Sequence, residues 1–209
     1  MDPRYAAIVL AGGRSVRMGG RHKPALPVDG VPMLHRVLAA VVDAAPRVVV
    51  GPPQPVPPGV RVVREDPPYG GPAAAIAAGL AAITPTPTPG YVAVLAADQP
   101  YVTGAAMAVL REALAAAGPP YVGAAYVDGG RPQLLCSLWR MDALARRRTE
   151  LDRVTDLPVR RFFADLPYVP VRSTATTPPW YDCDTEADWA ACTRGAPRSV
   201  APRRARGGE

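Results

Sequence analysis

Short apolar runs alternate with segments of helical periodicity through the first two thirds of the chain. The run from Tyr5 to Leu10 is apolar at every position, which is typical of a strand buried on both faces of a parallel sheet. By the same criteria, further strands are predicted at 47–50, 60–63, 91–96, 121–126, 133–138 and 168–171. Helices are predicted over 33–45, 72–83, 104–117, 141–148, 159–164 and 186–193. This order predicts an α/β fold with a doubly wound, mostly parallel sheet.

Turn and cap residues mark the ends of several of these elements. Thr103 and Thr185 are predicted N-caps, because a threonine hydroxyl can accept a hydrogen bond from a free amide of the first helical turn. The sequence Asp128-Gly129-Gly130 predicts a turn between the two strands on either side of it.

Length and charge define one domain and a tail. A chain of 209 residues can bury one core without a disulfide or metal staple. We predict a domain over 1–194 and a disordered tail over 195–209, which is rich in Arg, Pro and Gly. Five of the 24 basic residues and one of the 18 acidic residues lie between Arg194 and Glu209, so this end carries +4 of the net charge of +6. Since the rest shows no basic stripe, we expect no nucleic-acid partner.

Apolar runs and cysteines exclude several other classes. No stretch approaches 18 consecutive apolar residues, so we expect no membrane span, and the first apolar run is too short for a signal peptide. The three cysteines form no C-x-x-C pair and there are only two histidines, which argues against zinc. We therefore expect reduced thiols, a cytoplasmic location, and a monomer or weak homo-oligomer.

The strongest chemical signal is the glycine-rich segment LAGGRSVRMGGRHK, from Leu10 to Lys23. It leaves the carboxyl end of the first predicted strand, where open α/β sheets bind ligands, and its amides can converge on phosphate oxygens. It does not match the dinucleotide motif G-x-G-x-x-G, because that motif needs another glycine spacing. It does not match the Walker motif either, because Lys23 is followed by Pro24 in place of Ser or Thr. We therefore predict phosphate binding outside the dehydrogenase and P-loop classes.

Two charged residues add to this phosphate site. Lys23 is the only lysine, and the other basic residues are all arginine; a compact ammonium can bridge triphosphate oxygens and neutralise developing charge. In VLAADQP, Asp98 directly follows another apolar strand, and a carboxylate there can hold Mg²⁺ on nucleotide phosphates. The pair predicts phosphoryl chemistry at this edge of the sheet.

Four segments together resemble a known family: LAGGxSxRMG followed by Lys, then EDPPYGGPAAAIAAGL, then DQP, then YDCDTEADW. They are similar to the small nucleotidyltransferases of the molybdenum cofactor guanylyltransferase family, from about Tyr5 to Thr193. The resemblance implies a Rossmann-like nucleotidyltransferase fold. It also implies Mg²⁺-dependent transfer of GMP from GTP to the terminal phosphate of a molybdopterin-type acceptor, with release of pyrophosphate.

The resemblance also implies roles for individual residues. The residues that bind the nucleotide would be Leu10, Ala11, Gly12, Gly13, Arg14, Ser15, Lys23, Asp66, Gly71, Pro72 and Asp98. Lys23, Asp98 and Arg17 would be catalytic. Mg²⁺ would be held by Asp98 and Asp182, with Asp184 as the neighbouring alternative to Asp182.

Several departures from the family pattern keep alternatives open. The chain has GPAAA where guanylyltransferases usually have GPLAG, and it has Asp182 and Asp184 where they more often have Asn. The acidic pair favours cytidylyltransferase relatives, and transfer of GMP to another phosphorylated metabolite is a further alternative. Outside this reaction class, the alternatives are a nucleotide-binding accessory protein and a nucleic-acid-binding module that depends on the tail.

Overall fold

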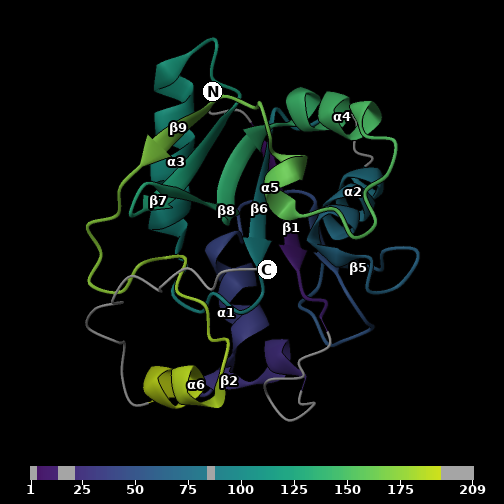
Figure 1. Cartoon of the computed structure of the whole chain (residues 1–209). Helices are drawn as coiled ribbons and strands as arrows, with labels where there is room; N and C mark the ends of the chain where they lie inside the picture. Colours follow the sequence, from purple (N-terminus) through teal and green to yellow (C-terminus); the bar gives the residue numbers. More distant parts are fainter. Residues whose placement is uncertain (1–3, 14–21, 84–87, 194–209) are drawn as a thin grey trace, which may run out of the picture.

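A seven-stranded sheet forms the centre of the computed structural model, which describes residues 4–13, 22–83 and 88–193. Its strands are β1 (Tyr5–Leu10), β4 (Arg47–Val50), β5 (Val60–Val63), β6 (Tyr91–Ala96), β7 (Gly123–Asp128), β8 (Arg131–Arg140) and β9 (Tyr168–Val171). Their order is β5-β4-β1-β6-β8-β7-β9, and only β8 runs antiparallel to its neighbours among these strands (Figure 1). The predicted α/β fold with a mostly parallel sheet is confirmed.

Helices cover both faces of the sheet (Figure 1). One face carries α1 (Met33–Ala40) and α3 (Gly104–Ala117), and the other carries α2 (Gly71–Ala82), α4 (Met141–Glu150) and α5 (Val159–Phe162). In β1, Val9 belongs to the core under α1 and α3, whereas Ile8 belongs to the core under α2. Successive strand side chains point to opposite faces, so a strand between two helical layers is apolar throughout.

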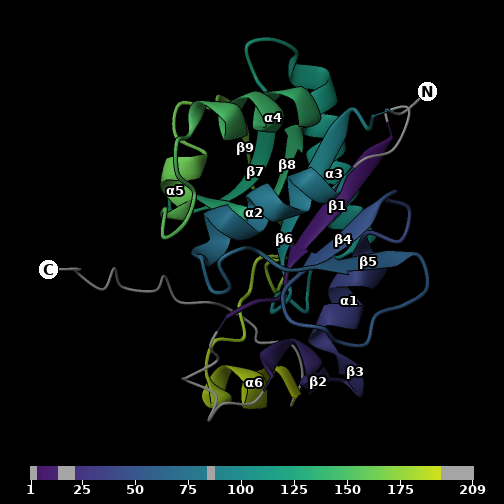
Figure 2. The ribbon, with the colours of Figure 1, turned by 90° about the vertical axis from the view of Figure 1, so that its right-hand side faces the viewer.

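A small unit lies beyond the carboxyl ends of β1 and β6. It contains the 3₁₀ turn η2 (Lys23–Ala25), the hairpin of β2 (Pro27–Val28) and β3 (Val31–Pro32), and α6 (Glu186–Thr193). Figures 1 and 2 both show α6 beside β2 at this end of the sheet. Trp189 Nε1 donates to the Pro27 carbonyl at 2.8 Å, and Val28, Cys183 and Cys192 share an apolar core. This packing brings the segment before α6 close to the first loops of the chain.

The helix predicted over 33–45 is shorter in the structure, where α1 ends at Ala40. Val41 and Ala44 are nonetheless buried in the core, in the turn that follows the helix. Their apolar character reflects tertiary burial and does not indicate more helix. The β2–β3 hairpin was not predicted, because each of its strands has two residues and shows no periodicity.

The predicted Asp-Gly-Gly turn joins β7 to β8. Gly129 and Gly130 have φ values of +52° and +79°, which is the backbone that a two-residue hairpin turn requires. Such a turn can only connect antiparallel neighbours, which explains the direction of β8.

Both predicted N-caps are confirmed. Thr103 Oγ1 accepts from the Ala106 amide at 3.1 Å at the start of α3. Thr185 Oγ1 accepts from the Asp188 amide at 3.1 Å, and Asp188 Oδ2 accepts from the Thr185 amide at 2.9 Å, so the pair forms a capping box before α6. None of the described helices is long and apolar enough to cross a membrane. The predicted tail at 195–209 lies outside the described residues.

Candidate active site

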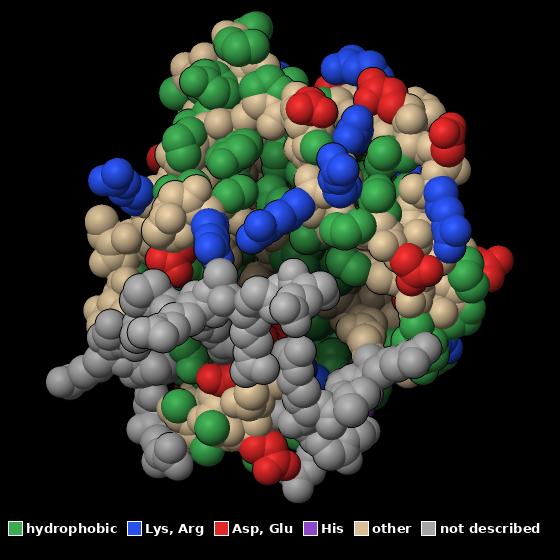
Figure 3. Space-filling view, in the orientation of Figure 1, with side chains coloured by type: hydrophobic (Ala, Val, Ile, Leu, Met, Phe, Trp, Pro, Cys, Tyr) green, Lys and Arg blue, Asp and Glu red, His purple; other side chains and the backbone are tan. Residues whose placement is uncertain are grey.

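A cavity of about 470 Å³ opens at the carboxyl ends of β1 and β6, where open α/β sheets bind ligands. The face in Figure 3 is hollowed near its centre, with hydrophobic and basic side chains around the hollow. The cavity is lined by Leu10, Ala11, Gly12, Gly13, Lys23, Pro24, Glu65, Tyr69, Gly71, Pro72, Ala75, Ala96, Ala97, Asp98, Leu135, Asp182 and Asp184. Most of the residues that the sequence resemblance selected therefore lie around one space.

The end of β1 is held tightly between its two neighbours in the sheet. The Ala11 amide donates to the Val50 carbonyl at 2.8 Å, and the Ala97 amide donates to the Leu10 carbonyl at 2.9 Å. A Cβ at Gly51 would lie 2.8 Å from the Ala11 carbonyl oxygen, so only glycine permits this approach. These contacts fix the backbone that leads into the glycine-rich segment. Arg14, Ser15 and Arg17 lie outside the described residues, so their predicted roles stay predictions.

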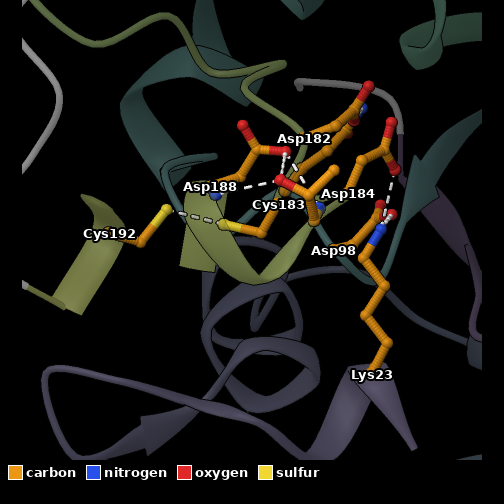
Figure 4. A network of polar contacts seen from close by, with 9 residues as sticks. Lys23, Asp98, Asp182, Cys183, Asp184, Asp188 and Cys192 are labelled. Atoms are coloured by element: carbon orange, nitrogen blue, oxygen red, sulfur yellow. Dashed lines mark hydrogen bonds and ion pairs between the residues drawn. The ribbon is translucent and has the colours of Figure 1, made fainter. Parts of the chain in front are cut away.

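Lys23 lies between two carboxylates on the cavity wall (Figure 4). Its Nζ donates to Asp98 Oδ2 and, at 2.8 Å, to Asp184 Oδ1, and 13% of its side chain is exposed. Burial lowers the pKa of Lys23, but the two carboxylates outweigh this effect and hold the pKa above its usual value. Lys23 is therefore a fixed ammonium at neutral pH, directed toward the end of β6.

Asp182 and Asp184 flank Cys183 on the segment that precedes α6. The Cys183 amide donates to the Asp98 carbonyl at 3.0 Å, which ties this segment to the end of β6. On the other side, Cys183 Sγ lies 2.6 Å from Cys192 Sγ, and both thiols are buried against α6 (Figure 4). The two carboxylates line the cavity, and Cys183 anchors the segment between them.

Asp182 is a strongly perturbed carboxyl group on the cavity wall. Burial, together with the nearby charges of Asp98 and Asp184, raises its pKa to about 7. Gln99 Nε2 donates to Asp182 Oδ1 at 3.0 Å, which offsets part of this effect. The site therefore gathers more negative charge than Lys23 alone balances.

This excess of carboxylates suits a bound cation. In the described part of the chain, no group of three or more His, Cys, Asp or Glu side chains is arranged to hold a metal ion. Mg²⁺, however, is commonly bound by one or two carboxylates together with substrate phosphates and water. Asp98 and Asp182 both line the cavity, and the charge of Asp98 is close enough to raise the pKa of Asp182, so the pair fits such a shared site.

Replacing Asp182 with asparagine is expected to flatten the pH dependence of stability. The Asp182 pKa is about 7 in the folded protein and near 3.8 for an unperturbed group. Between these values the native state holds a proton that the unfolded state lacks, so stability falls as the pH rises. The amide of the Asp182→Asn variant does not titrate, so this contribution disappears. Urea unfolding of both proteins from about pH 4 to pH 8 measures the effect, and parallel profiles would contradict it.

One residue predicted for the nucleotide site lies outside the cavity wall. Asp66 is exposed and does not line the cavity, whereas the preceding Glu65 is buried and does. Gly71 and Pro72 also line it, at the start of α2, and their role in a base pocket stays a prediction. Successive residues of an extended segment point in opposite directions, so a Glu-Asp pair alone does not reveal which carboxylate faces the site.

A curated relative, "Probable molybdenum cofactor guanylyltransferase" from Haloferax mediterranei, is 46% identical over 50 residues, which are 24% of this chain and 24% of that relative. The chain thus matches about a quarter of that relative's length.

Two solved structures share the fold. Molybdopterin-guanine dinucleotide biosynthesis protein A from Archaeoglobus fulgidus aligns with a TM-score of 0.67 at 17% identity, over 90% of this chain and 97% of its own. The 4-diphosphocytidyl-2C-methyl-D-erythritol synthase from Anaerococcus prevotii aligns with a TM-score of 0.64 at 13% identity, over 92% of this chain and 96% of its own. The sequence model of the MobA-like NTP transferase domain matches residues 7–171, and the chain therefore belongs to that family of nucleotidyltransferases.

Proposed function

We propose that the protein transfers GMP from GTP to the terminal phosphate of a molybdopterin-type acceptor and releases pyrophosphate. The observation that carries this proposal is the position of Lys23, held by Asp98 and Asp184 in the cavity at the end of β1. The family and the short guanylyltransferase match support the same reaction. The cavity volume of about 470 Å³ lies within the usual range for small-molecule sites.

The reaction needs little from the protein beyond alignment and charge neutralisation. An oxygen of the acceptor phosphate attacks the α-phosphorus of the nucleotide, and the bond to the bridging oxygen of the β-phosphate breaks. The attacking oxygen is already anionic, so no general base is required. Positioning and electrostatic stabilisation then supply the rate enhancement.

The described residues divide this work. The backbone of Leu10 to Gly13 would bind the nucleotide, and the Lys23 ammonium would contact phosphate oxygens and stabilise the leaving pyrophosphate. Asp98 and Asp182 would hold Mg²⁺. When bound, Mg²⁺ would polarise the phosphate oxygens and neutralise part of their charge.

Pyrophosphate release tests the proposal directly. The purified protein is mixed with GTP, Mg²⁺ and molybdopterin that carries its metal, and pyrophosphate is measured. We expect saturable release that needs both GTP and the acceptor. Thermal shifts with GTP, CTP, ATP and UTP accompany it, since a ligand at 100 times its Kd stabilises the fold by about 2.7 kcal/mol. Tight GTP binding without release on any acceptor would contradict transfer and favour an accessory protein.

Cytidylyl transfer is the second candidate. Asp182 and Asp184 favour it, because the guanylyltransferase pattern more often has asparagine in this segment. A Mg²⁺-dependent thermal shift with CTP, combined with pyrophosphate release from CTP and not from GTP, would establish this reaction in place of the first.

A further inference from the structure

Cys183 and Cys192 place two thiols in contact beside the active-site cavity (Figure 4). Cys183 lies between Asp182 and Asp184, which both line the cavity, and Cys192 lies in the last turn of α6. Their Sγ atoms are 2.6 Å apart, and both residues are fully buried in the small apolar core that also contains Val28. The fold thus brings together two reactive groups that are nine positions apart in the chain.

The third cysteine provides a comparison within the same protein. Cys136 is a free thiol and is as fully buried as the other two, but it belongs to β8 and to the separate core under α1 and α3. Burial is therefore common to all three cysteines, whereas the contact between two sulfur atoms is particular to Cys183 and Cys192.

One loop, between β6 and α3, holds the backbone of both cysteines. The Cys183 amide donates to the Asp98 carbonyl at 3.0 Å, and the Tyr101 hydroxyl donates to the Cys192 carbonyl at 3.3 Å. Because both residues are held from the same side, the sulfur atoms face each other in the folded protein before any reaction begins. Reacting groups that are already aligned need no further ordering of the chain.

We infer that Cys183 and Cys192 form an intramolecular disulfide when a peroxide oxidises them, and that this disulfide fastens α6 to the acidic segment of the cavity. A disulfide bond is about 2.05 Å long, so closing it from the observed contact requires only a small movement of either sulfur. The inference concerns a modification site and does not depend on the proposed transfer of GMP.

The reaction balances with a peroxide as the oxidant. Contact with Cys183 lowers the pKa of the Cys192 thiol and outweighs the effect of burial, so Cys192 supplies the attacking sulfur. This sulfur attacks one peroxide oxygen, the O–O bond breaks, and the departing hydroxide takes the thiol proton and leaves as water. The product is a sulfenic acid. Cys183 then attacks the sulfenic sulfur, the S–O bond breaks, and the hydroxide takes the Cys183 proton and leaves as a second water. The two thiols lose two electrons, which the peroxide gains.

Burial of both sulfur atoms sets the rate of this reaction. The oxidant reaches them only when α6 opens locally, and such partial opening costs less free energy than global unfolding. We therefore expect slower oxidation than for an exposed thiol. Once formed, the disulfide opposes the same opening, so hydrogen exchange of the α6 amides should be slower in the oxidised protein than in the reduced protein.

Peptide mapping of the full-length wild-type chain tests the inference. The folded protein is treated with hydrogen peroxide, the remaining thiols are alkylated, and the protein is digested with trypsin. The segment from Ser173 to Arg194 has no internal Lys or Arg, so both cysteines stay in one peptide. We expect this peptide to escape alkylation and to be lighter by two hydrogen atoms, while Cys136 is alkylated.

Three results of this mapping would overturn the inference. The first is alkylation of all three cysteines, even after treatment in urea just below the unfolding transition, where α6 can open. The second is sulfinic acid on either cysteine in place of the disulfide. The third is a disulfide between two copies of the chain.

Melting curves test whether the disulfide fastens α6. We expect the oxidised wild-type protein to melt about 3–8 °C above the reduced protein, and dithiothreitol should reverse this rise. Cys192→Ala should lose both the disulfide and the rise, whereas the matched control Cys136→Ala should keep both. An oxidised wild-type protein that melts at or below the temperature of the reduced protein would contradict the fastening. This comparison needs no variant, so it stands if Cys192→Ala folds poorly.

Discussion

Replacing Lys23 with alanine is expected to lower the rate of pyrophosphate release by about 10²- to 10³-fold, the usual cost of losing one group that stabilises transition-state charge. The variant loses the ammonium that Asp98 and Asp184 hold in the cavity. It also leaves these two carboxylates without their shared counter-charge, which repels the incoming phosphates. Stopped assays at saturating GTP and acceptor measure the change in kcat.

Lys23→Arg is the sharper variant, because it keeps the charge and changes its shape. A planar guanidinium cannot occupy the same point between two carboxylates, so most of the loss should remain. Circular dichroism and melting curves control for folding. Near wild-type turnover of Lys23→Ala would remove Lys23 from the reaction. Full rescue by arginine would reduce its role to a general positive charge.

Replacing Asp98 with asparagine is expected to lower turnover by a similar factor of about 10²- to 10³-fold and to raise the Mg²⁺ concentration needed for half-maximal rate. Asparagine keeps the size of the side chain but lacks the charge that binds a hard cation. The substitution also removes one of the two carboxylates that raise the pKa of Lys23.

The matched control for this variant is Asp152→Asn, which removes an exposed carboxylate just after α4. Its turnover and Mg²⁺ dependence should equal those of the wild type. Asp98→Asn protein with an unchanged Mg²⁺ dependence would contradict a metal role for Asp98. A loss of turnover that Mg²⁺ concentration does not alter would restrict Asp98 to holding Lys23.

Much of the fold can be predicted from local patterns, for physical reasons visible in single elements. The apolar run of β1 predicts a strand covered on both faces, and Ile8 and Val9 do pack in opposite cores. Hydroxyl caps such as Thr103 act within one helical turn, so neighbouring residues suffice to predict them. The predicted end of α1 was wrong, because Val41 is apolar for tertiary reasons.

The candidate site shows where local patterns stop being informative. The segment from Leu10 to Gly13, Lys23 and Asp98 could be predicted because each follows or accompanies a recognisable strand end or motif. The choice between Glu65 and Asp66 could not, because burial on the cavity wall depends on how β5 leads into α2. The contact of Lys23 with Asp184 joins residues far apart in the chain.

The succession of strands and helices along the chain, the helix caps, the glycine-rich segment and the family were therefore determined by the amino-acid sequence, since periodicity, turn chemistry and motifs are local properties. The tertiary structure alone decided which carboxylates share Lys23, how the thiols of Cys183 and Cys192 anchor the acidic segment, and whether Glu65 or Asp66 faces the cavity. These depend on packing α6 against β2 and on the order of strands across the sheet, where contacts between distant residues set the geometry.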